Sequence, residues 1–335
     1  MKSLNSDGET GVAISGDEGT KRLPPGFAPI SLRSFEAGKP PLVDLYCMVD
    51  DQLVLYCEAE SVFSEQAKIA LLDNGVETLY VDNRKGKPIL DVNDLARVLS
   101  LPMEQMPPLV KAGLLYSSTI QTTKRVLANA DDPGCRSLAQ RLVSMTVSQF
   151  LRHDDVFHAI VQMMRHDPSV YSHSVNVCAY GVALGIKLGF SVPDLLEIGL
   201  GALLHDAGKT RVPVEILTKP GPLTAEEWAV MRQHPAWGAQ MMQGFLVEKP
   251  VALTVVLCHH ERLDGSGYPA GQVDEAVLPA ARVASLVDVY DALTSERPYR
   301  PALRPFDALY TMETLMRRQL DQRYLGCFVE LLGGR

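Results

Sequence analysis

The sequence predicts an α+β protein in which a small α/β region precedes a larger helical region. Strand-like runs lie between residues 42 and 81, helical periodicity dominates from about residue 101 onward, and all eight histidines lie between His153 and His260. We therefore expect four parts: a flexible tail (1–28), a small α/β accessory or regulatory domain (29–100), a helical connector (101–153) and an all-α domain (154–335).

Composition and charge exclude several classes of function. The chain has 335 residues, enough for two compact domains, and its formal net charge of -8 gives no general attraction to nucleic acid or anionic membrane. It has no N-terminal apolar segment typical of a signal peptide and no apolar run of membrane-spanning length. Six dispersed cysteines without a CxxC pair favour reduced thiols. The sequence thus predicts a cytoplasmic protein that binds neither DNA, RNA nor membrane.

The N-terminal region changes character near residue 29. The stretch 1–28 is rich in small and charged residues and cannot bury enough apolar surface to fold. Three strands are expected next, at Leu42–Met48, Leu53–Cys57 and Glu77–Val81. A helix capped by Ser64 and ending near Leu72 is expected between the second and third strands. These segments contain no cluster of histidines or carboxylates, which favours a regulatory or docking role over a second active site.

Helices fill the rest of the chain. Pro107-Pro108 opens a helical stretch that runs to about Ala130, a break follows at Asp131–Gly134, and helix resumes to about His153. A coiled-coil or dimerising role is open for this connector. Further on, Ser191 and Thr224 mark helix starts through a proline in the first turn and a capping box, respectively.

Two apolar helices run directly into polar clusters. The segment 199–204 ends at His205-Asp206, and 251–258 ends at His259-His260. Unpaired polar groups at buried helix ends cost a few kcal/mol, and a metal ion would satisfy them. Taken by itself, the first cluster is better explained by a helix cap with Gly208 and a solvated Lys209, whereas a tight turn does not explain the adjacent histidines of the second cluster.

Other residues extend these clusters. His173 and His234 lie in helical contexts, and Asp288 and Asp291 share one helix face. Together these groups suffice for a two-metal site, which stabilises the entering and leaving oxygens of a phosphoryl displacement. Lys209 could hold a phosphate oxygen. The nearby Arg297 and Arg300 suit phosphate as well, although solvated surface charge is an equal alternative for them.

A series of motifs resembles one family. The strings YSHSV, LLHDAGK, ILTKPGPLT, MRQHPAWG, HHERLDGSGYP and ARVASLVDVYDALTSERPYRPA follow in this order. They resemble the HD-GYP domain of bacterial signalling proteins over roughly residues 167–302. This resemblance implies an all-α HD-type fold, a bi- or trinuclear metal centre, and hydrolysis of cyclic di-GMP to pGpG or GMP.

The resemblance also implies a role for individual residues. It gives the metal ligands as His173, His205, Asp206, His234, His259, His260 and Asp288, with Asp206 bridging. Asp206 and Lys209 would be catalytic, and Asp291 would orient a ligand. Substrate contacts would come from Asp167, Lys209, Tyr268, Arg297 and Arg300. Ser169 departs from the pattern, because members with a third metal have Glu there, so we expect two metals.

The sequence therefore predicts a cyclic di-GMP phosphodiesterase with two divalent metal ions. Iron or manganese is preferred, and zinc or nickel is also compatible with the ligands. Alternatives stay open: a non-catalytic receptor for cyclic di-GMP, a module that binds a partner such as a diguanylate cyclase, or an enzyme for a related nucleotide such as cGAMP. Homodimer formation is also open.

Overall fold

The structure is a computed structural model that divides into two compact units. One comprises residues 1–88 and 100–110, and the other comprises 89–99 and 111–335. Each unit is described by itself. The described residues are 27–32, 44–49, 52–57, 63–73, 76–82, 108–129, 132–164, 170–296 and 301–333.

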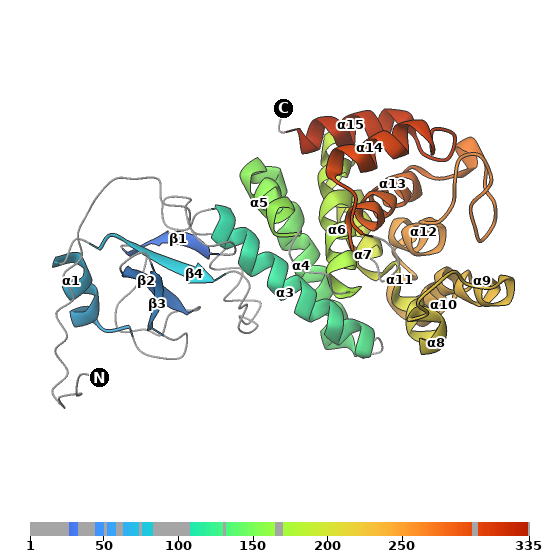
Figure 1. The fold of residues 1–335 in the computed structure, drawn as a ribbon. Coiled ribbons are helices and arrows are strands. Elements are labelled where there is room, and N and C mark those ends of the chain that lie inside the picture. Colours follow the sequence, from blue (N-terminus) through green and yellow to red (C-terminus); the bar gives the residue numbers. More distant parts are fainter. Residues whose placement is uncertain are drawn as a thin grey trace. The chain divides into compact units, whose positions relative to one another are not determined.

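The described residues of the first unit form a four-stranded antiparallel sheet in the order β1-β4-β2-β3, with one helix (Figure 1). Its elements are β1 (Phe27–Ser31), β2 (Leu45–Val49), β3 (Gln52–Cys57), α1 (Glu65–Asp73) and β4 (Thr78–Asp82). Leu45, Phe63 and Leu79 are buried in its core. The three predicted strands and the helix are confirmed, and the Ser64 hydroxyl accepts a hydrogen bond from the Ala67 amide, at 3.1 Å.

Strand β1 was not predicted, and it begins two residues inside the stretch expected to be a tail. Pro29 lies in the middle of β1, opposite Tyr80 of β4. Proline cannot donate to a strand ladder and is confined to edge strands, the position that β1 occupies. The proline therefore argues against a strand in the sequence, and the strand forms because β1 pairs with β4.

The second unit is built of helices. The longer ones are α3 (Pro108–Ala128), α4 (Pro133–Arg152), α5 (Asp154–Met164), α6 (Val170–Lys187), α7 (Val192–Leu204), α12 (Pro250–Cys258), α13 (Pro279–Thr294), α14 (Pro305–Thr314) and α15 (Gln322–Leu332). Shorter ones are η2 (Ala207–Arg211), α8 (Val214–Leu217), α9 (Ala225–Met231), α10 (His234–Met241), α11 (Gln243–Leu246) and η3 (Asp274–Ala276). The predicted α+β fold with a helical C-terminal part is confirmed.

Helices α6 and α7 form the centre of this unit. Helix α6 packs against α4, α7, α13 and α15, while α7 also packs against α12 (Figure 1). Glycines allow this close approach, since a Cβ on Gly199 would lie 2.7 Å from Val143 Cγ1, and one on Gly201 would lie 2.7 Å from Ala252 O of α12. The C-terminal ends of α7 and α12, which carry His205 and His259, therefore lie together. Helix α4 of the predicted connector packs within this same unit.

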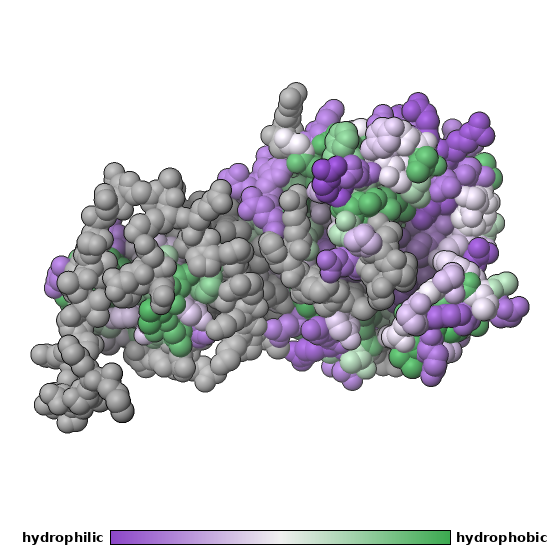
Figure 2. Space-filling model, viewed as in Figure 1, coloured by the Kyte–Doolittle hydropathy of each residue, from purple (hydrophilic) through white to green (hydrophobic). Residues whose placement is uncertain are grey.

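The predicted helix starts are confirmed. The Ser191 side chain accepts from the Asp194 amide at the start of α7, and Thr224 and Glu227 form a reciprocal capping box at the start of α9. In the part of the chain that the structure describes, no helix has the length and hydropathy needed to cross a membrane. The visible surface of the helical unit mixes hydrophilic and apolar patches (Figure 2).

Candidate metal centre

Five segments of the helical unit bring histidines and carboxylates together. They are α6, the end of α7 with η2, the start of α10, the end of α12, and α13. The residues they contribute are His173, His205, Asp206, His234, His259, His260, Asp288 and Asp291. All are buried except His260, which is intermediate. The sequence-predicted ligands thus meet at one place, although they span more than one hundred residues of the chain.

Backbone carbonyls fix the orientation of three of the imidazole rings. The Nδ1 atoms of His205, His234 and His259 lie 2.7 Å, 2.8 Å and 3.0 Å from the carbonyl oxygens of Ala202, Met231 and Val256. A carbonyl oxygen can only accept, so each Nδ1 carries the proton. In the neutral ring the Nε2 atom then has a free lone pair, which is the state that binds a metal.

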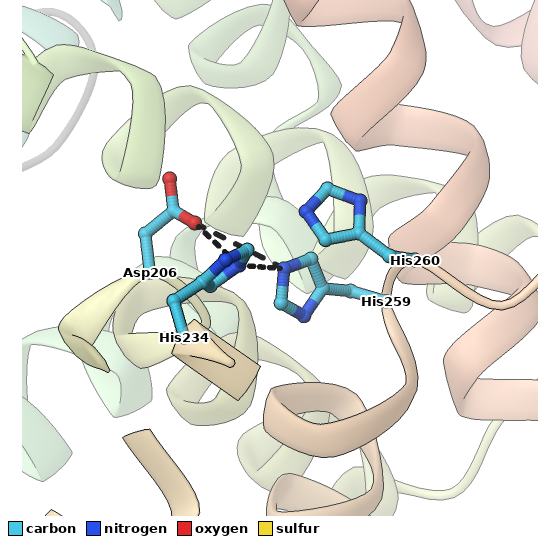
Figure 3. Close-up of side chains that lie close together, drawn as sticks. All are labelled: Asp206, His234, His259 and His260. Carbon is cyan, nitrogen blue, oxygen red and sulfur yellow. Dashed lines mark hydrogen bonds and ion pairs between the residues drawn. The ribbon is translucent and has the colours of Figure 1, made fainter. Parts of the chain in front are cut away.

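These lone pairs point toward one another. The Nε2 atoms of His234 and His259 are 3.2 Å apart, and those of His205 and His173 are 3.3 Å apart (Figure 3 shows the first pair). The Nε2 atoms of His234 and His259 are both unprotonated, and at this distance they repel each other unless a cation lies between them. With metal–nitrogen distances of about 2.1 Å, two ligands of one ion are separated by about 3.0–3.4 Å. The spacing therefore fits shared coordination.

The carboxylate of Asp206 lies between the two pairs. Its Oδ1 atom is 3.4 Å from His234 Nε2 and 3.9 Å from His259 Nε2. Its Oδ2 atom is 3.4 Å from His205 Nε2 and 3.7 Å from His173 Nε2. Oδ1 is buried and has no hydrogen-bond partner among the described residues. A buried, unpaired carboxylate oxygen is costly, and a cation would satisfy it.

Helix α13 supplies the other two carboxylates. Asp288 Oδ1 lies 3.2 Å from His173 Nε2, and Asp288 Oδ2 lies 3.6 Å from His260 Nδ1. Asp291 Oδ2 lies 2.7 Å from His173 Nδ1. Asp291 therefore contacts the outer nitrogen of His173, whereas Asp288 faces the centre of the cluster.

The electrostatics of the cluster favour ligand protonation states. Burial lowers the pKa of His259 and of His234, and lowers that of His260 to about 3, so these rings are neutral. Burial alone would raise the pKa of Asp206, but Lys209 and the neighbouring histidines hold it well below its usual range. Neutral imidazoles and an ionised carboxylate are the forms that bind divalent cations.

His173 behaves differently. Burial by itself lowers its pKa, but hydrogen bonds to Asp288 and Asp291 outweigh burial and raise the pKa to about 9. Burial would raise the pKa of Asp288, but the hydrogen bond from His173 and electrostatic interactions with His260, His173 and His205 hold it well below the usual range. A proton on His173 thus compensates the carboxylates, as a metal ion bound here would do.

Polar and aromatic groups border the cluster. Lys209 is partly exposed and its ammonium group forms an ion pair with Asp206 Oδ2. The ring of Tyr268 lies 4.7 Å from that of His260, between centroids, and the Arg232 guanidinium lies 5.6 Å from the Tyr268 ring. These contacts place Lys209 and Tyr268 beside the cluster. The predicted residues Asp167, Ser169, Arg297 and Arg300 lie outside the described residues.

Two buried residues near the site were not predicted. Glu261 accepts hydrogen bonds from the amides of Ala270 (2.7 Å) and Gln272 (2.9 Å), and so braces the loop that carries Tyr268. Asn176 donates to Asp291. Its position three residues after His173, on the same face of the helix, was the available signal. The same loop also needs a glycine at Gly267, because a Cβ there would lie 2.4 Å from the backbone nitrogen of Arg262.

Comparison with known proteins identifies the family. The family model described as "HD domain" matches residues 140–324, more than half of the chain. The chain belongs to the HD domain family. A solved HDG"Y"P protein from Bdellovibrio bacteriovorus has the same fold, with a TM-score of 0.64 at 18% identity over 92% of this chain and all of that one. The predicted HD-GYP resemblance is confirmed.

Curated relatives carry related names. The chain is 38% identical to "Cyclic di-GMP phosphodiesterase PA4108" of Pseudomonas aeruginosa, over 58% of this chain and 47% of that protein. It is 41% identical to "Cyclic di-GMP phosphodiesterase response regulator RpfG" of Xanthomonas campestris pv. campestris, over 44% and 39%. It is 35% identical to "3'3'-cGAMP-specific phosphodiesterase 3" of Vibrio cholerae, over 49% and 35%. The chain thus spans less than half the length of these relatives.

Proposed function

We propose that this protein is a metal-dependent phosphodiesterase that hydrolyses cyclic di-GMP to pGpG, GMP or both. The observation that carries the proposal is the Asp206 carboxylate, each oxygen of which faces one pair of histidine nitrogens, while Oδ1 has no hydrogen-bond partner among the described side chains and backbone. The relatives named as cyclic di-GMP phosphodiesterases support the substrate.

The arrangement supports two ion sites that share Asp206. One would use His173, His205, Asp288 and Asp206 Oδ2, and the other would use His234, His259, His260 and Asp206 Oδ1. A set of nitrogen and oxygen donors without thiolates suits iron or manganese, and also zinc or nickel. Two bound divalent ions would supply Lewis-acid stabilisation of the entering and leaving oxygens of a phosphoryl displacement.

The chain's own residues would orient the substrate. Lys209, at the edge of the cluster, would donate a hydrogen bond from Nζ to a phosphate oxygen and assist proton transfer. Tyr268 would shape the pocket wall through its ring, which packs against His260. From the resemblance we further propose that Arg297 and Arg300 contact phosphate or base, and that Asp167 contacts the guanine edge.

The test uses the full chain purified without oxygen and loaded with Mn²⁺ or Fe²⁺. Products of cyclic di-GMP are separated by chromatography, and metal content is measured on the same samples. We expect pGpG or GMP from the wild type, and loss of both metal and activity in Asp206→Ala. Asp307→Ala, which removes an aspartate of α14 away from the cluster, should keep both.

Two results would redirect the proposal. A folded, metal-loaded wild type that leaves cyclic di-GMP intact would overturn it, and binding without hydrolysis, with fewer than two metals per chain, would favour a receptor. A parallel reaction with 3'3'-cGAMP is included because a relative named for that substrate is 35% identical. If the protein hydrolyses 3'3'-cGAMP faster than cyclic di-GMP, the proposed substrate changes while the proposed reaction, phosphodiester hydrolysis, stands.

A further inference from the structure

A chain of buried hydrogen bonds leads from helix α3 to His173. The Tyr116 hydroxyl lies 2.7 Å from Asn176 Oδ1, and Asn176 Nδ2 lies 2.8 Å from Asp291 Oδ1. Asp291 Oδ2 then lies 2.7 Å from His173 Nδ1. These four side chains come from α3, α6 and α13, and each is at most 8% exposed.

The direction of each bond in this chain is determined. The Asn176 amide donates from its NH₂ group to Asp291 Oδ1, because the other end of the amide is an oxygen and can only accept. Its Oδ1 atom then faces Tyr116, whose hydroxyl donates. A flipped amide would place an oxygen against the carboxylate, which is repulsive. Tyr116 therefore fixes Asn176, Asn176 fixes Asp291, and Asp291 holds the His173 ring with Nε2 toward Asp206 and Asp288.

This support differs from that of the neighbouring rings. His205, His234 and His259 each bond through Nδ1 to a backbone carbonyl three residues earlier, so their orientation depends on local chain geometry. The Nδ1 atom of His173 bonds to a side chain 118 residues away. If the His173 Nδ1 atom needed only some hydrogen-bond partner, a nearby backbone carbonyl would supply one, as it does for the other three rings. The orientation of His173 instead depends on how α3 and α13 pack against α6.

We propose that Tyr116 and Asn176 are positioning residues that set the metal affinity of the site containing His173, and this rests on the proposed metal centre. Tyr116 lies in the helix within which the two compact units divide, six residues after Val110. A displacement of α3 would release Asn176 and loosen one metal ligand of the cluster. In the other site, backbone carbonyls orient the rings of His234 and His259, and the shared Asp206 connects these rings to His173.

The test is a titration of metal-free full-length protein with Mn²⁺, in which free Mn²⁺ is followed by its electron paramagnetic resonance signal. The variants are Tyr116→Phe, which removes only the hydroxyl, and Asn176→Leu, which removes both hydrogen bonds at similar volume. Thr123→Val is the matched control, since its buried hydroxyl in α3 donates to Thr119 O of the same helix and bonds to no other described residue. Thermal unfolding of each metal-free variant reports stability separately.

We expect two Mn²⁺ ions in the wild type, with one site weakened in both variants and the other unchanged. Loss of an outer partner of a ligand typically costs about 10- to 100-fold in metal affinity, so Asn176→Leu should fall in that range. Tyr116→Phe acts one residue further away and should lose severalfold. Thr123→Val should keep both affinities even if its stability falls.

The outcomes separate this inference from the proposed function. If the wild type binds two Mn²⁺ ions and both variants bind them with unchanged affinity, the positioning role is wrong while the metal centre stands. Equal weakening of both sites in proportion to lost stability would also overturn it, because that is the result of a purely structural role. A wild type that binds no Mn²⁺ would overturn the metal centre and this inference together.

Discussion

The glycine after the His-Asp pair gives a sharp test of how the site is assembled. Gly208 lies in η2, two residues after Asp206 and directly before Lys209. A Cβ at this position would lie 1.9 Å from the carbonyl oxygen of His234 and 2.6 Å from the amide nitrogen of Gly238. Both atoms belong to the backbone of α10 and cannot move aside as a flexible side chain could. Gly208→Ala therefore has to push η2 away from α10.

The size of the displacement follows from the contact. Because Cβ atoms essentially never approach within 3.0 Å, η2 and α10 must separate by at least about 1.1 Å. Metal–ligand distances tolerate only about 0.2 Å, and Asp206 and His234 lie on opposite sides of this contact. A misplacement of about 1 Å costs roughly 100-fold in rate. Overpacking of this kind also costs about 1–3 kcal/mol of stability.

The assay compares kcat/KM for cyclic di-GMP, Mn²⁺ affinity and the free energy of unfolding. We expect Gly208→Ala to lose at least about 100-fold in kcat/KM and to bind metal weakly while it keeps its helical content. Gly221→Ala is the matched control, because a Cβ there would meet no atom within 4 Å, and it should behave as the wild type. Wild-type activity and metal affinity in Gly208→Ala would refute the reasoning.

Three further predictions concern the loop, the C-terminal helix and the metal. In chemical denaturation, Glu261→Gln should lower the free energy of unfolding by about 1–3 kcal/mol, because one of the amides of Ala270 and Gln272 loses its acceptor. The control is Glu248→Gln at an exposed position, and an equal effect of this substitution would contradict the prediction. Burial would raise the pKa of Asp321, but hydrogen bonds from Arg282 and from the α15 amides outweigh burial and lower it. The stability that Asp321 contributes should therefore be present above its unfolded pKa of about 3.9 and be lost as the pH falls further. In acid denaturation, the difference in stability between wild type and Asp321→Asn should shrink below about pH 4. A difference that does not change with pH would argue against this role. Mn²⁺ at one hundred times its dissociation constant should stabilise the metal-free protein by about 2.7 kcal/mol, seen as a higher Tm, and an unchanged Tm would exclude binding to the folded state alone.

Much of the site could be predicted because its signals are local or carried by motifs. The adjacent histidines His259 and His260 at the end of an apolar helix indicated a site, and the ordered motifs added His205, which a helix cap would otherwise have explained. Caps at Ser191 and Thr224 depend on residues three positions apart, which the sequence displays directly.

The remainder depends on tertiary packing. Tyr116 and Asn176 are sixty residues apart, and nothing in either neighbourhood indicates that they form a hydrogen bond. Strand β1 contains Pro29, which argues against a strand until its edge position is known. The role of Glu261 depends on a loop that folds back over it, so its two amide partners lie nine and eleven residues later.

The bridging position of Asp206 is tested most directly by anomalous scattering from crystals of the full chain grown with Mn²⁺. We predict two peaks, one within ligand distance of Asp206 Oδ1 with His234 and His259, and one within ligand distance of Asp206 Oδ2 with His173 and His205. A single peak, or peaks that do not share Asp206, would contradict the proposed two-metal centre.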